Sequence, residues 1–195
     1  MNFSNFTKHI NEHINVLENL NNELFLELDK VIDHLANAIE NRHNIFWCGN
    51  GGSCSDAQHL AAELVGRFEN SRKALPSIAL SADTSVITCI ANDYGYENIY
   101  SRQIEGLGKE GDIIFVISTS GQSKNILKVL EVANQLKLVT VGLLGTSKSD
   151  ATSKCRFSLN IESSSTARIQ ETHIFLGHFI LENLETTLLN KKIIK

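Results

Sequence analysis

A histidine and a glutamate in the segment 56–68 have the types and the spacing for acid–base or metal chemistry. His59 and Glu63 are four residues apart, so they share one face of the helix that this segment is expected to form. Such a pair can bind a metal ion, or can place a carboxylate base beside a cation that polarises a substrate oxygen. A solvent-facing pair is the alternative that these two residues leave open. The HExxH motif of zinc proteases is absent from the sequence.

A second group of polar side chains lies among apolar residues near the C-terminus. Gln170, His173 and His178 fall in a segment whose apolar residues have near-helical spacing. A single histidine on such a face is more often a core or surface residue than a ligand. Gln170 and His178 are also separated by about 12 Å along a straight helix. We expect them to share a site only if the helix is broken or if two chains contribute.

A loop rich in hydroxyl groups joins an apolar segment to a helical one and could bind an anion. Residues 118–123 read Ser-Thr-Ser-Gly-Gln-Ser. A helix start offers free backbone N–H groups and the positive end of the helix dipole, and the hydroxyls add further donors. Ser118 or Ser120 could instead only cap the helix. Because the loop holds more hydroxyls than a cap needs, we predict that it binds a phosphate.

Residues 49–53, Gly-Asn-Gly-Gly-Ser, form a second loop of this kind. They match neither the Walker A motif nor the GxGxxG fingerprint of dinucleotide-binding proteins. Glycines here could let a ligand approach the backbone, or could simply make a tight turn. The loop therefore favours a small phosphorylated metabolite over a nucleotide. Asn92 and Asp93 follow an expected helix, and a helix end is enough to explain them.

Short apolar segments alternate with helical ones along most of the chain. We expect strands over 45–48, 77–80, 112–117, 139–144 and 157–161. We expect helices over 56–68, 85–91, 124–136 and 166–189. This alternation predicts a parallel sheet covered on both faces, with its strand ends and their loops at one ligand-binding edge.

The first 40 residues predict an N-terminal helical arm of two helices, with a break at Asn21–Asn22. Apolar residues recur at steps of three and four, including Phe6, Ile10 and Ile14. These apolar stripes must bury against the rest of the chain or against a partner subunit. We expect one domain over 1–195, with the arm over 1–40 and an α/β core over 44–195.

Composition excludes several classes of protein. The chain has 195 residues, of which 42% are hydrophobic and 21% charged, so wholesale disorder is excluded. The net charge of −4 and the lack of a basic block argue against non-specific nucleic-acid binding. No apolar run approaches the roughly 20 residues of a membrane span. The N-terminus does not resemble a secretory signal, and the four cysteines form no CxxC pair. We therefore expect a soluble, cytoplasmic protein.

Four segments together resemble the SIS (sugar isomerase) domain family, and within it the phosphoheptose isomerases. They are CGNGGSCSDAQHLAAELVGRF (48–68), IANDYGYE (90–97), ISTSGQSKN (117–125) and TARIQETHIFLGH (166–178). The resemblance implies a single SIS domain with a three-layer, flavodoxin-like α/β fold. It implies conversion of sedoheptulose 7-phosphate to D-glycero-D-manno-heptose 7-phosphate for surface polysaccharides such as lipopolysaccharide or capsule. It also implies a homotetramer with active sites between subunits, and one Zn²⁺ per subunit.

The resemblance also assigns roles to individual residues. The phosphate would be held by Ser118, Thr119, Ser120 and Ser123. The rest of the sugar would be bound by Asn50, Gly51, Gly52, Ser53, Asn92, Asp93, Gln170 and Glu63. Zinc would be bound by His59, Glu63, Gln170 and His178. Glu63 would move the proton between C1 and C2 through an enediol, and His178 would move the proton between O1 and O2.

Two other functions remain open for a chain of this kind. One is a non-enzymatic SIS tetramer that binds a replication initiator protein. In that relative the positions equivalent to Glu63 and His178 are not an acid–base pair, whereas this sequence keeps both residues and His59. The other is a phosphosugar-sensing module, which usually carries a further domain. The sequence favours the enzyme.

Overall fold

The computed structural model of the protein describes residues 2–194, and its centre is a parallel β-sheet. The strands are β1 (Ile45–Gly49), β2 (Ser77–Ala79), β3 (Ile113–Ser118), β4 (Val139–Leu144) and β5 (Phe157–Asn160). They lie in the order β2-β1-β3-β4-β5, and every neighbouring pair is parallel. This is the strand order of the flavodoxin-like folds, so the predicted fold class is confirmed.

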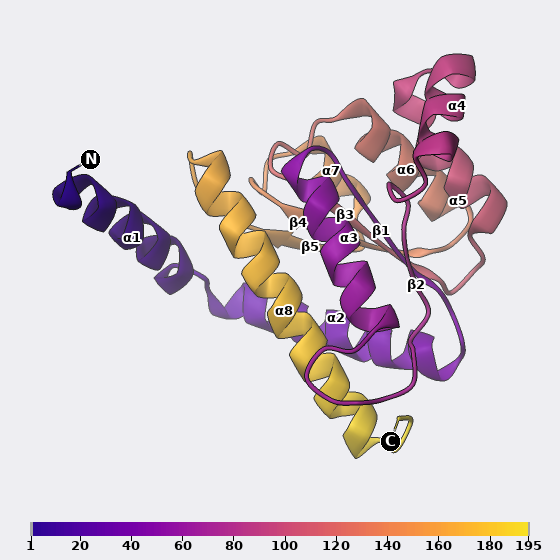
Figure 1. Ribbon diagram of the computed structural model, residues 1–195, viewed down its shortest axis with the longest axis horizontal. Helices are drawn as coiled ribbons and strands as arrows, with labels where there is room; N and C mark the ends of the chain where they lie inside the picture. The colour runs from indigo at the N-terminus through magenta and orange to yellow at the C-terminus, as the bar shows by residue number, and fades with distance from the viewer. Residues whose placement is uncertain (1, 195) are drawn as a thin grey trace.

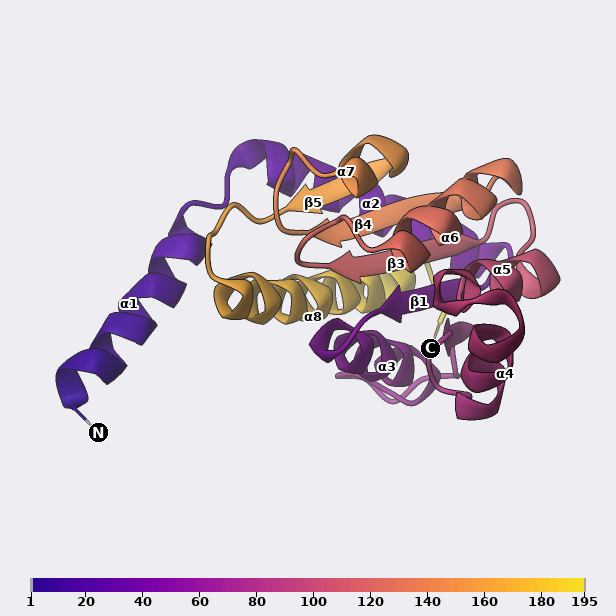
Figure 2. The ribbon, with the colours of Figure 1, turned by 90° about the horizontal axis from the view of Figure 1, so that it is seen from above.

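Helices cover both faces of the sheet (Figure 2). The helices are α1 (Phe3–Glu18), α2 (Asn22–Glu40), α3 (Gly52–Val65), α4 (Thr84–Tyr94), α5 (Ser101–Leu107), α6 (Lys124–Gln135), α7 (Asp150–Lys154) and α8 (Thr166–Asn190), with a 3₁₀ turn η1 (Tyr96–Asn98). Apolar residues of α2, α3 and α8 form one core cluster with one face of the sheet. Those of α4, α5, α6 and α7 form a second cluster with the other face.

The two central strands are buried throughout because helices cover them on both sides. Every residue of β1 and of β3 is buried. Trp47 of β1 stacks on Phe115 of β3 with 4.2 Å between ring centroids, and its indole N–H donates to Ser77 Oγ at 2.8 Å. Their near-continuous apolar sequences are typical of parallel strands in this setting. This rigid centre places the ends of β1 and β3 side by side.

The two N-terminal helices behave differently. Asn21 caps α2, its side chain accepting from the Leu24 N–H at 2.9 Å, which confirms the predicted break. The apolar stripe of α2 is buried in the core, whereas α1 projects away from the sheet (Figure 1). Phe6, Ile10 and Ile14 are 56%, 42% and 44% exposed. Within this chain, most of the α1 stripe is therefore uncovered.

Several element boundaries differ from the predictions. Helix α3 begins at Gly52 rather than at 56, because the glycine loop turns directly into the helix, and it ends at Val65 rather than at 68. The short α5 and α7 were not predicted, since seven and five residues are too few to show a periodic pattern. Within residues 2–194, no helix has the length and apolarity needed to cross a membrane.

Candidate active site

The loop between β1 and α3 brings the chain to the carboxyl edge of the sheet. Gly51 has φ +57°, a left-handed conformation that favours glycine. Gly52 lies against α8, since a Cβ added there would be only 1.9 Å from Gln170 Nε2. The small residues of this loop thus allow Gln170 to reach the start of α3. Ser53, the fourth predicted residue of this stretch after Asn50, Gly51 and Gly52, is buried.

The side chain of Asn50 connects this loop to the neighbouring one. Its amide donates to Asn125 Oδ1 at 2.9 Å and its oxygen accepts from Asn125 Nδ2 at 2.8 Å. The hydroxyl of Tyr96 also donates to Asn50 Oδ1 at 3.1 Å. Asn125 is 2% exposed in the first turn of α6. The loops after β1 and β3 are therefore joined by a reciprocal amide pair.

The hydroxyl-rich loop lies between the end of β3 and the start of α6. Ser118 is buried and its Oγ accepts from the Gly121 N–H at 3.0 Å, while Ser120 Oγ accepts from the Gln122 N–H at 3.3 Å. Ser123 occupies the N-cap position of α6, but its side chain makes no capping hydrogen bond. Thr119, also predicted to contact phosphate, is half-buried. A hydroxyl that makes no capping bond is thus present beside a helix start, where backbone N–H groups and the helix dipole favour an anion.

Helices α3 and α8 bring three of the predicted chemical groups together. His59 Nε2 lies 2.9 Å from His178 Nε2, and 3.6 Å from Glu63 Oε1. The 2.9 Å contact is a hydrogen bond in which one ring donates and the other accepts, so at least one imidazole nitrogen is unprotonated. Phe68 stacks on His178 with 5.6 Å between centroids. Glu63 and His178 therefore belong to one cluster, although 115 positions separate them in the sequence.

Gln170 lies away from this cluster, at the other end of α3. Its contacts there are with Gly52 and with the carboxylate of Asp56. Burial raises the pKa of Asp56, and the hydrogen bond from Gln170 and the charge of His59 partly oppose that shift. Helix α8 runs without a break from Thr166 to Asn190. A broken helix therefore does not bring Gln170 to His178.

The last two predicted sugar-binding residues lie at the end of α4. Asn92 Nδ2 donates to Asp93 Oδ1 at 2.7 Å, and both residues are exposed. They precede Tyr96, whose hydroxyl reaches Asn50. The pair is therefore on the segment that borders the loop after β1.

The family of the chain follows from its match to known proteins. The family model of the SIS domain matches residues 8–145. The chain belongs to the SIS domain family. A phosphoheptose isomerase from Geotalea daltonii is 45% identical over 183 residues, which span 94% of this SIS chain and 95% of that protein. The resemblance stated from the sequence is confirmed.

Solved structures agree with this assignment. A phosphoheptose isomerase from Francisella tularensis superposes with a TM-score of 0.90 at 31% identity, covering 95% of this chain and 100% of the other. A second, from Neisseria gonorrhoeae, superposes with a TM-score of 0.87 at 32% identity, covering 94% and 98%. This SIS chain is thus similar to phosphoheptose isomerases along nearly its whole length, and the relatives indicate an isomerase.

The zinc site expected of such an SIS protein is only partly assembled. Two imidazole nitrogens and one carboxylate are donors that zinc accepts, so His59, His178 and Glu63 fit the metal in kind. However, no group of three or more His, Cys, Asp or Glu side chains among residues 2–194 is arranged to hold a metal ion. The Nε2 atoms of His59 and His178 are 2.9 Å apart and hydrogen-bonded to each other. Zinc is therefore not established by this geometry.

Sequence reasoning missed three side chains of this site. Asp56 is on α3 one turn before His59, a spacing that could have identified it. Tyr96 falls inside one of the family segments but bears no catalytic signature of its own. Asn125 is the last residue of the family segment 117–125, and no local pattern reveals its contact with Asn50.

Proposed function

We propose that this SIS chain is an aldose–ketose isomerase that converts sedoheptulose 7-phosphate into D-glycero-D-manno-heptose 7-phosphate. The observation that supports the proposal is the meeting of His59, Glu63 and His178 where α3 packs against α8, in a chain whose relatives are named phosphoheptose isomerase. The product supplies heptose for surface polysaccharides such as lipopolysaccharide or capsule. The enzyme works in the cytoplasm on a free phosphosugar, and no nucleic acid takes part.

The phosphate is held by the loop after β3. Hydroxyls of Ser118, Thr119, Ser120 and Ser123, together with backbone N–H groups at the start of α6, supply the donors. The sugar chain then extends along the loop after β1, where it is bound by Asn50, Gly51, Gly52 and Ser53, with Asn92 and Asp93 from α4 and Gln170 and Glu63 from the helices. Support comes from the amide pair that holds these two loops together.

The isomerisation is a proton transfer between neighbouring carbons. Glu63 removes a proton from C1 of the ketose to form an enediol, and returns a proton to C2. His178 moves the hydroxyl proton from O1 to O2, so that C1 becomes the aldehyde. A carboxylate and an imidazole suit these roles because both take up and release protons near neutral pH when placed in a site. The 2.9 Å contact with His59 supports an unprotonated nitrogen in this histidine pair.

We also propose one Zn²⁺ per subunit, bound by His59, Glu63 and His178, with Gln170 as a further ligand. When bound, the metal would polarise the substrate oxygens. Because α8 is continuous, Gln170 and His178 of one chain remain about 12 Å apart along it, so a shared ligand set draws on neighbouring chains. The donor types of the first three residues support the proposal.

We propose further that the protein is a homotetramer with its active sites at the subunit interfaces. Helix α1 presents Phe6, Ile10 and Ile14, all more than 40% exposed, and an apolar stripe of this kind needs cover. We infer that residues 1–195 form one SIS domain in each subunit. Sedimentation of the purified protein is the test: a mass of four chains is expected, and a monomer at micromolar concentration would contradict the assembly.

The activity test is incubation of the purified protein with sedoheptulose 7-phosphate in deuterated water, followed by NMR. We expect the heptose 7-phosphate to form with deuterium at C2, and Glu63→Gln to abolish its formation while phosphosugar binding persists. Glu131→Gln removes an exposed carboxylate that pairs with Lys154 and serves as the control. No product with or without added zinc would overturn the proposal in favour of a binding protein.

A further inference from the structure

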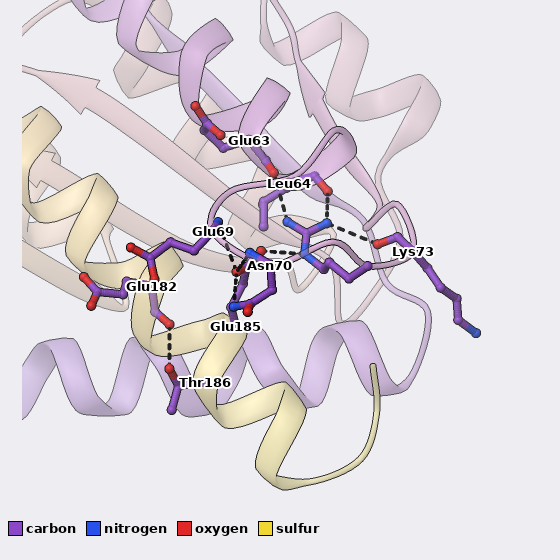
Figure 3. A network of polar contacts seen from close by, with 9 residues as sticks. Glu63, Leu64, Glu69, Asn70, Lys73, Glu182, Glu185 and Thr186 are labelled. Atoms are coloured by element: carbon purple, nitrogen blue, oxygen red, sulfur yellow. Dashed lines mark hydrogen bonds and ion pairs between the residues drawn. The ribbon is translucent and has the colours of Figure 1, made fainter. Parts of the chain in front are cut away.

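A buried ion pair joins the loop after α3 to helix α8 (Figure 3). Arg72 Nε donates to Glu185 Oε1 at 2.7 Å, and the two side chains are 0% and 2% exposed. Burying a guanidinium and a carboxylate together contributes little stability compared with apolar side chains of the same size. The structural effect of this pair therefore lies in the backbone groups that its remaining hydrogen bonds hold in place.

The other N–H groups of Arg72 hold the end of α3. Nη2 donates to the Glu63 carbonyl at 2.9 Å, and Nη1 donates to the Leu64 carbonyl at 2.8 Å and to the Lys73 carbonyl at 3.1 Å. The last four carbonyls of a helix have no partner within the helix, and a cation there also complements the helix dipole. Arg72 thus fixes the turn from which the Glu63 side chain projects.

Glu185 holds the loop after α3 against α8. Its Oε2 accepts from the Asn70 N–H at 3.1 Å, from Asn70 Nδ2 at 3.0 Å and from the Glu69 N–H at 3.3 Å. Burial alone would raise the pKa of Glu185, but the bonds from Asn70 and Arg72 outweigh it and hold the pKa below its usual value. The carboxylate is therefore ionised at neutral pH.

The ion pair spans the two helices that carry the chemical groups. Glu185 lies seven residues after His178 on α8, which is about two turns along the same face. The two helices approach closely next to His178, since a Cβ added at the preceding Gly177 would be 2.7 Å from Leu60 Cδ1. The network therefore sets the position of the last turn of α3 relative to α8, and with it the separation of Glu63 from His178.

We propose that Arg72 and Glu185 are positioning residues of the isomerase, which hold Glu63 and His178 in the relative placement that proton transfer needs. The proposal rests on the acid–base roles given to those two residues above. Neither Arg72 nor Glu185 touches the substrate. Their effect passes through the backbone carbonyls of α3 and the fixed spacing of two helices.

The test compares kcat and KM of Glu185→Gln and Arg72→Lys with those of the unchanged enzyme, corrected for the folded fraction. We expect kcat to fall by about ten- to a hundredfold, as displacement of a reacting group by an ångström or less does. KM should change by less than about threefold, because the phosphate loop after β3 is on a separate element. Unchanged kcat in both variants would overturn the proposal.

Asp112→Asn provides a matched control. Asp112 is another buried carboxylate. It accepts hydrogen bonds from the backbone N–H groups of Asn44 at 2.8 Å and Lys109 at 2.9 Å, but it directly precedes β3, at the end away from the phosphate loop. The Asp112→Asn variant should be less stable than the unchanged enzyme without a lower kcat. An equal loss of kcat in this control would show a general effect of destabilisation and would overturn the positioning role.

Double variants separate positioning from a general structural effect. In a Glu63→Asp background, whose carboxylate is already displaced, Glu185→Gln should reduce kcat by a much smaller factor than in the unchanged enzyme. Equal factors would overturn the proposal. If Glu63→Gln itself retains full turnover, the proposed function fails first, which is a distinct result. If Arg72→Lys does not fold, Glu185→Gln alone decides, since it keeps the shape of the side chain.

Discussion

The side-chain amides of Asn50 and Asn125 hydrogen-bond to each other in both directions, at 2.9 and 2.8 Å, and so tie the loop after β1 to the first turn of α6. The two residues are 75 positions apart in the sequence. Asn50 follows β1 and Asn125 follows β3, and these two strands are parallel neighbours in the sheet. In flavodoxin-like folds the ligand crevice lies where neighbouring connections leave in opposite directions. This pair spans that point, between the two loops proposed to bind the sugar and its phosphate.

Asn125→Ala should loosen the two loops. The amide of Asn50 would lose both of its bonds to Asn125, so we expect the free energy of unfolding to fall by about 1–3 kcal/mol and KM to rise more than kcat falls. Urea denaturation and steady-state kinetics measure the two effects. Asn134→Ala is the control, because Asn134 lies on the same helix but bonds to the Lys154 carbonyl instead. Similar KM values for the two variants would contradict the prediction.

His173 should make stability depend on pH. It is fully buried in α8, and burial lowers its pKa from 6.5 to about 4. Below pH 6.5 the unfolded chain binds a proton that the folded chain does not, so stability is lost as the pH falls toward 4. The loss attributable to this residue is at most about 3 kcal/mol. Urea denaturation between pH 7.5 and about 4.5 should show it.

The same series on His173→Leu identifies the source. This variant should have a flatter dependence of unfolding free energy on pH than the unchanged protein. His9→Gln, which alters an exposed histidine of α1, should leave the dependence as it was. Parallel curves for His173→Leu and the unchanged protein would exclude His173 as the cause.

Gly52→Ala should act through Gln170. The added Cβ would meet the end of the Gln170 side chain at 1.9 Å, and that flexible amide would have to leave its place beside the start of α3. We expect turnover to fall about tenfold, close to the effect of Gln170→Ala, and the double variant to lose little more. Gly106→Ala is the control, since an added Cβ there meets nothing within 4 Å. Additive losses would refute this link.

Zinc content tests the proposed metal site. Protein purified with zinc and then desalted should retain about one ion per chain by elemental analysis, and a chelator should lower activity. His59→Gln should lose most of the bound zinc, because one of two imidazole ligands is removed. His34→Gln, which alters a half-buried histidine on α2 that packs against Phe157, should retain the zinc. Equal zinc content in the two variants would place any metal elsewhere.

Local sequence was sufficient for the architecture. Apolar runs such as 112–117, which the structure places in β3 (Ile113–Ser118), identified buried strands, and the alternation with helices predicted a parallel sheet with loops at one edge. The predicted loops do lie at the ends of β1 and β3. Short α5 and α7, and the true start of α3 at Gly52, were beyond pattern analysis because a few residues carry too little periodicity.

The chemical residue types were also readable from the sequence, but their grouping was not. The spacing of His59 and Glu63 determined that they share a face of α3, since helix geometry is local. That His178 joins them while Gln170 lies at the other end of α3 was decided by how α8 packs across α3. Arg72 and Glu185 are 113 positions apart, and only the folded core removes both from water and pairs them. Contacts between distant segments depend on how whole helices and strands pack, and the spacing of residues within one segment does not predict that packing.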